Sequence, residues 1–100
     1  MRIIALSILK AFWEECPEYM DVKEPILVWY RHVLAADWSI PAEVKKDFRN
    51  ASILKYGRVV FNIAGNKYRL VVWINYAYRV IYIRFIGTHG QYDKIDVQTI

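Results

Sequence analysis

Apolar residues repeat with two different periods along this chain, and the period changes near residue 53. In the first part, apolar side chains recur at helical spacing, beginning with Ile8, Leu9, Phe12, Trp13 and Cys16. This spacing places them on one stripe of a 3.6-residue period, so it predicts a helix with one side against a core. Ser7 is expected to cap this helix, and Pro17 is expected to end it.

Two further helices are predicted before the period changes. The second begins near Pro25, because proline is suited to a first helical turn. Its helical repeat is carried by Ile26, Tyr30, Val33, Leu34 and Asp37. A third, short helix starts at Pro41, with Ser39 or Ile40 at its entrance and Val44 and Phe48 directed inward.

From about residue 53 the apolar residues alternate with a period of two, which is typical of β-strands. Three strands are predicted, separated by turns near residues 64–66 and 75–78. The face covered by helices is expected to carry Leu70, Val72, Ile74, Ile81, Ile83 and Phe85. The opposite face carries Lys67, Arg69, Tyr82 and Arg84, because unpaired cations are costly to bury.

The predicted elements indicate an α+β fold in one domain spanning residues 1–100. N-terminal helices pack on a small antiparallel sheet of three to four strands, with residues 2–5 as a possible short edge strand. The chain has a formal net charge of +4, but the charge is uneven. Residues 43–86 hold nine lysines and arginines against two acidic residues. This basic part indicates a polyanionic partner, although a solvated cationic face without a ligand has the same composition.

Few other chemistries fit the residues present. Cys16 is the single cysteine, so no disulfide within the chain is expected, which suits a reducing cytoplasm. The two histidines and Cys16 are too widely separated for metal-ligand spacing, and no nucleotide-binding glycine loop is present, so neither metal nor cofactor is expected. No uncharged apolar run approaches the roughly 20 residues of a membrane span. We therefore expect a soluble cytoplasmic protein with no membrane partner.

Two longer motifs resemble a known family. They are Arg58-x-x-Phe-Asn-Ile-x-Gly-Asn-Lys-Tyr-Arg-Leu and Tyr82-Ile-Arg-Phe-Ile-Gly-Thr-His-x-x-Tyr-Asp-Lys-Ile. Together they are similar to the HigB family, toxins of type II toxin–antitoxin pairs in the RelE-like superfamily, over about residues 52–97. The resemblance implies a RelE-like α+β fold and a ribosome-dependent mRNA interferase of the bacterial cytoplasm. It also implies three partners: mRNA, the ribosomal A site, and a helix-turn-helix antitoxin (HigA-like) through which alone operator DNA is bound.

The resemblance also suggests roles for individual residues in metal-independent cleavage through the RNA 2′-hydroxyl. Arg69 stands where the superfamily places a phosphate-binding arginine, and Lys67 could bind phosphate or assist proton transfer. His89 is the candidate general acid or phosphate ligand, and Tyr92 is expected to position a base or aid proton transfer. Further contacts to RNA are expected from Arg84, Arg58, Lys55, Trp73 and Tyr82.

Each of these residues also has a purely structural interpretation, such as an exposed strand arginine or a packed tyrosine. Two other functions therefore stay open at this stage. One is a non-catalytic RNA- or ribosome-binding module with the same basic sheet. The other is a degenerate toxin that acts only as an antitoxin-binding co-repressor.

Overall fold

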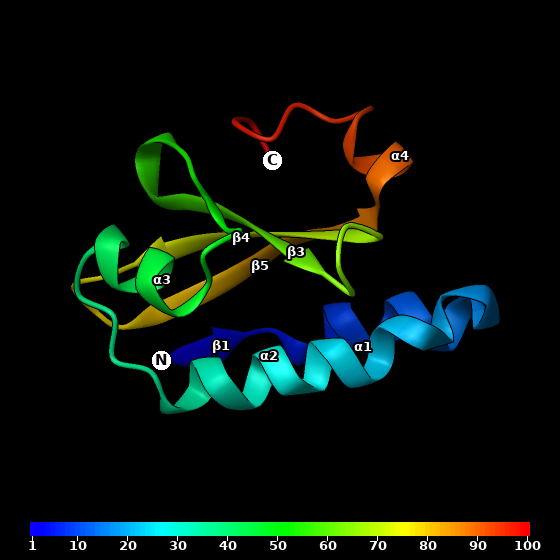
Figure 1. The fold of residues 1–100 in the computed structure, drawn as a ribbon, viewed down its shortest axis with the longest axis horizontal. Coiled ribbons are helices and arrows are strands. Elements are labelled where there is room, and N and C mark those ends of the chain that lie inside the picture. The colour runs from blue at the N-terminus through cyan, green and yellow to red at the C-terminus, as the bar shows by residue number, and fades with distance from the viewer.

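A five-stranded sheet with helices on one face forms the centre of the computed structural model, which describes all residues from 1 to 100 (Figure 1). The strands are β1 (Arg2–Ile4), β2 (Ser52–Ile53), β3 (Arg58–Ile63), β4 (Tyr68–Asn75) and β5 (Val80–Thr88). They lie in the order β1-β5-β4-β3-β2, with β1 parallel to β5 and the other neighbours antiparallel. The α+β class is confirmed. The sheet is mixed and has five strands because β1 joins one edge and the two-residue β2 joins the other.

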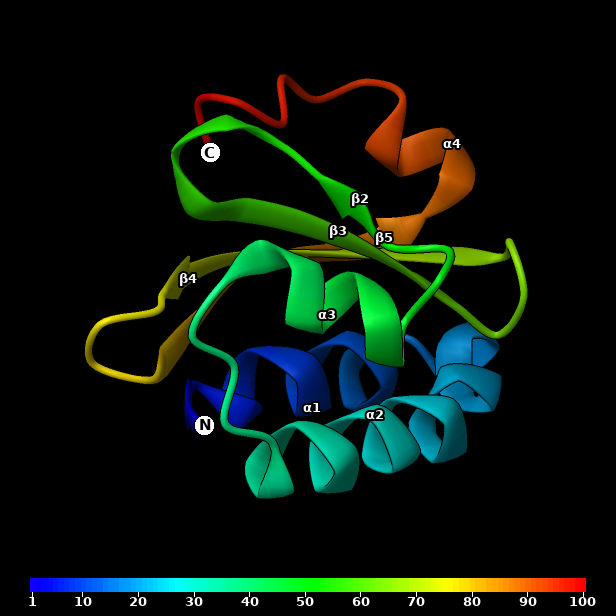
Figure 2. The same ribbon diagram turned by 60° about the vertical axis from the view of Figure 1, so that its left-hand side comes forward.

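Helices precede the β3–β5 meander and follow it. They are α1 (Leu6–Glu15), η1 (Pro17–Val22), α2 (Lys23–Ala35), α3 (Pro41–Asp47), η2 (Lys55–Gly57) and α4 (His89–Tyr92), where η denotes a 3₁₀-helix. Helices α1 and α2 cover one face of the sheet, and the C-terminal segment lies on the other (Figures 1 and 2). None of the helices combines the length and apolar content that a membrane crossing requires.

Helix α3 begins at Pro41 as predicted, whereas the starts of α1 and α2 differ from the predicted ones. Helix α1 begins at Leu6 with Ala5 as its N-cap, so Ser7 lies inside the helix and caps nothing. The reason is that β1 leads into α1 with no intervening turn. Helix α2 begins two residues before Pro25, because η1 runs directly into it. Pro25 is tolerated there since the N–H groups of a first helical turn have no partner in the helix.

The core lies between α1, α2 and the sheet. Of the predicted stripe on α1, Leu9 and Trp13 are buried, while Ile8 is 46% exposed. On α2 the buried stripe contains Trp29, which the sequence did not place, and Leu34 is 45% exposed. The Trp29 ring packs edge-on against Phe61 of β3 with centroids 5.4 Å apart. The buried stripe on each of these two helices is thus narrower than the apolar stripe that the sequence predicts.

A β-bulge in β5 changes which side chains face the helices. Val72 pairs with Ile83 and Val71 pairs with Phe85, which leaves Arg84 as the extra residue. A bulge shifts the alternation of side chains beyond it. Phe85 consequently leaves the core face, and Ile86 packs against the core instead. The prediction that helices cover Phe85 was therefore wrong.

We call the face of the sheet turned away from α1 and α2 the outer face. The C-terminal segment, residues 93–100, passes over it (Figure 2). Val60 and Val71 are 3% and 0% exposed although neither belongs to the core between sheet and helices. Arg58 also donates from Nε and Nη2 to the carbonyl oxygen of Ile100, at 3.2 and 2.5 Å. Part of the face predicted to be polar is therefore covered by the chain itself.

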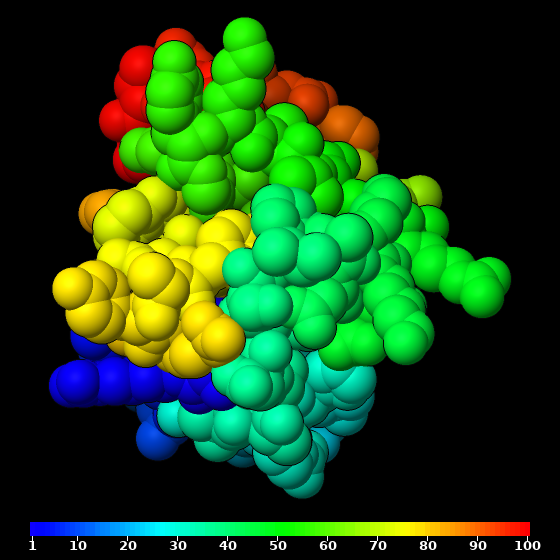
Figure 3. All heavy atoms as spheres, turned by 90° about the vertical axis from the view of Figure 1, so that its left-hand side faces the viewer, coloured from blue at the N-terminus to red at the C-terminus, as the bar shows by residue number.

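The turn between β4 and β5 is fastened to the helical layer. Arg79 Nε lies 2.6 Å from Asp37 Oδ1, just after α2, and the Arg79 carbonyl accepts a hydrogen bond from the Arg2 N–H at 2.8 Å. In Figure 3 this turn, yellow, lies beside the teal connection between α2 and α3 and above the blue N-terminal strand. Arg69 and His89, which the sequence predicts to be functional, lie at the opposite end of the sheet, near the β3–β4 turn.

Candidate functional site

Arg69 lies near the start of β4, directly between two neighbouring strands. It pairs with Asn62 of β3 on one side and with Gly87 of β5 on the other. Because Tyr68 and Leu70 are buried on the core face, the alternation of a strand places Arg69 on the outer face. Its Nη1 donates to the carbonyl oxygen of Asn66 at 2.9 Å, while Nε and Nη2 have no partner in the chain. Those free donors form the planar fork that suits a phosphate.

His89 is brought to the same end of the sheet by a helix cap. Thr88 Oγ1 accepts from the Gln91 N–H at 3.2 Å, and Gln91 Oε1 accepts from the Thr88 N–H at 2.8 Å. This capping box starts α4 at His89. The His89 N–H donates to the carbonyl oxygen of Lys67 at 3.1 Å, which fixes the start of α4 beside the start of β4. The backbones of Arg69 and His89 therefore lie at the same end of the sheet.

The imidazole of His89 has a carboxylate partner that the sequence analysis did not assign. Its Nδ1 lies 3.2 Å from Asp93 Oδ2, and both side chains are more than half exposed. The four-residue spacing between them is the signal that could have predicted the contact. The ring's Nε2 has no partner in the chain, so it is free to meet a substrate. Tyr92, also in α4, is half-buried.

Lys67 points elsewhere than predicted. Its Nζ bonds to the carboxylate of Asp21 in η1, and the hydroxyl of Tyr68 donates to the same carboxylate. The bond from Lys67, followed by the one from Tyr68, holds the pKa of Asp21 below its ordinary value of 3.8. Burial, and then the bond to Asp21, raises the pKa of Tyr68. Lys67 belongs to the turn before β4, so the strand alternation used to place it beside Arg69 does not apply.

Several of the predicted RNA-binding residues form a second cluster on the outer face. The rings of Trp73 and Tyr82 stack with centroids 5.1 Å apart, and the guanidinium carbon of Arg84 lies 6.0 and 5.9 Å from them. Trp73 is four residues from Arg69 along β4, a separation of about 13 Å at the rise of a strand. The cluster therefore lies at a second position along the same strand.

Arg58 and Lys55, the other two predicted RNA-binding residues, differ in whether their donors are already bonded within the chain. Arg58 pairs with Trp73 across β3 and β4, but its guanidinium is already bonded to Ile100. Lys55 is exposed in η2 and has no partner in the chain. Of the two, only Lys55 has its full donor capacity available.

No deep pocket surrounds these residues. The surface has three hollows, and neither Arg69 nor His89 lines any of them. No group of three or more His, Cys, Asp or Glu side chains is placed to hold a metal ion. An exposed, cationic surface with aromatic rings can contact a polymer strand, whereas small-molecule sites are usually concave.

Comparison with known proteins identifies the family. Residues 22–95 match the HigB toxin family, described as the RelE-like toxic component of a toxin–antitoxin system. The chain belongs to this family. It is also 31% identical over 91 residues to the mRNA interferase HigB of Escherichia coli O6:H1 (strain CFT073), with 88% of each chain covered. The resemblance inferred from the two motifs is thus confirmed, and membership implies an antitoxin as a partner. Lys67, Arg69, His89 and Tyr92 all lie within the matched residues.

Proposed function

We propose that residues 1–100 form one toxin domain that cleaves mRNA on the ribosome without a metal or cofactor. The observation that carries this proposal is the joint placement of Arg69, with free guanidinium donors, and His89, with a free Nε2, at one end of β4 and β5. The similar E. coli protein is named an mRNA interferase, which supports the same activity. The domain would act in the bacterial cytoplasm.

The proposed reaction uses the nucleophile that RNA already carries. The 2′-oxygen attacks the adjacent phosphorus and gives its proton to solvent water, the bond from phosphorus to the 5′-oxygen breaks, and that oxygen takes up a proton. Arg69 stabilises the charge that develops on the phosphate, and His89 donates the proton from Nε2. The products are a 2′,3′-cyclic phosphate and a 5′-hydroxyl end.

The remaining site residues have supporting roles in this proposal. Tyr92 positions a base beside the scissile bond. Lys67 contributes after exchanging the carboxylate of Asp21 for a phosphate oxygen, since both are anionic acceptors. Arg84, Trp73 and Tyr82 hold the strand further along β4 through charge and stacking.

The antitoxin is proposed to be a helix-turn-helix protein that binds operator DNA and carries the toxin to it. Induced expression tests the whole proposal. Wild-type protein is expected to arrest growth and to cut translated mRNA, and co-expression of the antitoxin is expected to restore growth. Arg69→Ala should strongly reduce both effects, while Arg31→Ala, at an exposed arginine on α2, should keep them.

Two results would favour the alternatives. RNA retained on ribosomes without new ends would indicate a non-catalytic binding module. A tight antitoxin complex formed by a wild-type protein that neither arrests growth nor cuts RNA would indicate a co-repressor.

A further inference from the structure

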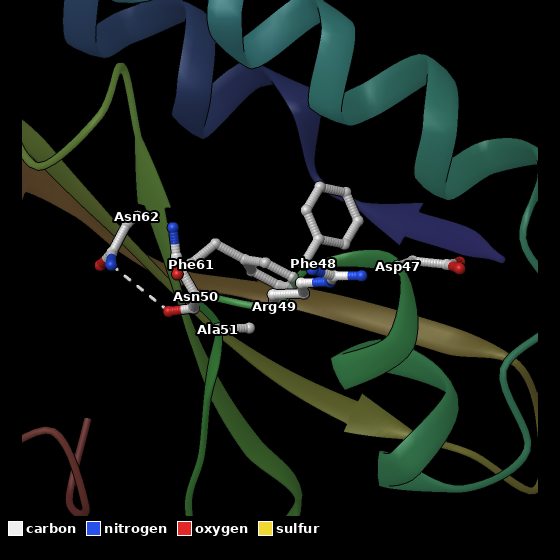
Figure 4. Close-up of a pocket in the computed structure, with 7 residues that line it drawn as sticks. All are labelled: Asp47, Phe48, Arg49, Asn50, Ala51, Phe61 and Asn62. Atoms are coloured by element: carbon white, nitrogen blue, oxygen red, sulfur yellow. Dashed lines mark hydrogen bonds between the residues drawn. The ribbon is translucent and has the colours of Figure 1, made fainter.

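A hollow of about 260 Å³ lies at the outer edge of β3, beside the strand position that opposes Arg69 (Figure 4). One wall is the connection between α3 and β2, which contributes Phe48, Arg49 and Asn50. The other wall is β3, which contributes Asn62. None of these four residues takes part in the proposed reaction, and the sequence pattern predicts only the inward packing of Phe48.

The hollow has unused hydrogen-bonding groups of both kinds. Asn62 Nδ2 donates to the backbone carbonyl of Asn50 at 3.3 Å, which fixes the orientation of this amide (Figure 4). Its Oδ1 has no partner, and neither the side-chain amide of Asn50 nor the guanidinium of Arg49 is bonded within the chain. Acceptors and donors are therefore available side by side.

The position of the hollow connects it to the proposed site. Asn62 and Arg69 are direct cross-strand partners, so their Cβ atoms are separated by about 4.5–5.5 Å. A strand whose phosphate is bound by Arg69 would therefore have a neighbouring base within reach of the hollow. The lining also includes the apolar residues Phe48, Ala51 and Phe61, against which the flat side of that base can pack.

The chemistry of the lining matches the edge of a base. Carboxamides can donate and accept together, which matches the paired donors and acceptors on base edges. Sequence-specific recognition of RNA relies on such contacts to unstacked bases. The carboxylate of Asp47, which also lines the hollow, accepts from Trp38 Nε1 and points away from Asn50 and Asn62 (Figure 4), so the asparagines and Arg49 provide the free polar groups.

We propose that this hollow binds one unpaired RNA base next to the scissile phosphate, and that Asn50 and Asn62 read its edge. The inference rests on the proposed function, because it takes the bound strand from that reaction. It assigns to this chain a source of sequence preference that is separate from the residues performing the cleavage.

Non-cleavable RNA tests base binding without relying on activity. The side-chain amide resonances of Asn50 and Asn62 would be followed by NMR during titration with 2′-O-methyl trinucleotides. One set would carry each of the four bases in turn, and a matched set would carry an abasic central residue. Base-containing trinucleotides are expected to shift both amides, with one base giving the largest shift, and the abasic ones are expected to leave them unchanged. Equal shifts with abasic RNA, or none with any RNA, would overturn the inference.

Cleavage mapping then separates this inference from the function on which it rests. Asn62→Ala and Asn50→Ala are expected to lower cleavage at preferred sites about tenfold, the effect of roughly 1.4 kcal/mol, and to flatten the preference among sequences. Gln98→Ala, which removes an exposed amide elsewhere, should retain the wild-type pattern. An unchanged pattern in both asparagine variants, with cleavage strongly reduced in Arg69→Ala, would reject the base site and leave the proposed function intact. Absence of cleavage by wild type would reject the function, and the NMR titration would still decide whether a base binds.

Discussion

The Nδ1 atom of His89 lies 3.2 Å from Oδ2 of Asp93, four residues further along the chain. This contact leaves Nε2 as the ring nitrogen free for a substrate. A carboxylate at Nδ1 also favours the tautomer and orientation in which Nε2 can exchange a proton, as second partners of functional histidines commonly do. Asp93 is therefore expected to position His89 without contacting RNA.

Replacing Asp93 tests this positioning role. Asp93→Ala should reduce the cleavage rate by at most about fivefold, because exposed pairs of this kind contribute roughly 0.2–1 kcal/mol. Asp93→Asn keeps a carbonyl oxygen that can accept from Nδ1, so it should retain most of the activity. Single-turnover rates with saturating ribosomes give the measurement, and RNA affinity should not change. Equal losses in both variants, or a loss confined to affinity, would contradict the positioning role.

The cluster of Arg84 with Trp73 and Tyr82 is expected to hold RNA through charge. Arg84→Ala should weaken binding of single-stranded RNA and reduce the slope of log K against log salt concentration by about 0.7. Melting temperature should change little because Arg84 is exposed. Fluorescence titrations at several salt concentrations measure the slope, with Arg31→Ala as the charge-matched control. An identical change in both variants would show that only net charge matters.

Asp47 is expected to stabilise the fold through Trp38. The Trp38 indole N–H donates to Asp47 Oδ2 at 3.0 Å, and Trp38 is only 2% exposed. Asp47→Ala leaves that buried donor unpaired, at a cost of about 1–3 kcal/mol, and each kcal/mol lowers the melting temperature of a chain this size by about 4–8 °C. Asp47→Asn retains an acceptor and should lose less. Thermal unfolding followed by circular dichroism distinguishes the two, and equal melting temperatures for all three proteins would refute the role.

Asp21 should make stability depend on acid pH. Its pKa in the folded protein lies below the ordinary 3.8, so the carboxylate contributes stability above that value and loses it as pH falls through the folded pKa. Asp21→Asn should therefore be less stable than wild type at neutral pH, and the difference should shrink as the pH falls below 3.8. Chemical unfolding across this range measures it, with Glu14→Gln, at an exposed residue without an ion pair, as the control. A difference that grows toward acid pH would have the wrong sign.

The sequence predicted those parts of the fold that depend on local period. Alternation from Arg58 to Asn75 gave the β3–β4 hairpin and placed Arg69 on the outer face, and the structure agrees. The bulge at Arg84 was not predictable, because its apolar neighbours fit an uninterrupted alternation equally well. Phe85 was assigned to the wrong face for that reason.

Contacts between distant segments were also missed. Lys67 bonds to Asp21, a residue 46 positions earlier, and no local pattern connects the two. Arg58 was predicted to contact RNA, but the C-terminal segment folds over the outer face and its Ile100 carbonyl accepts from the Arg58 guanidinium. The position of Asn62, by contrast, was predictable, because the alternation of side chains in the hairpin places it on the same face as Arg69.

The most direct test of the central claim is to map RNA ends after reaction of purified protein with programmed ribosomes. Wild type and Arg31→Ala should generate new 5′-hydroxyl ends with matching 2′,3′-cyclic phosphates. Arg69→Ala should lower the rate by about 10²–10³-fold, as removal of a single transition-state donor does. Ends of another chemistry, or equal cleavage by Arg69→Ala, would contradict the account.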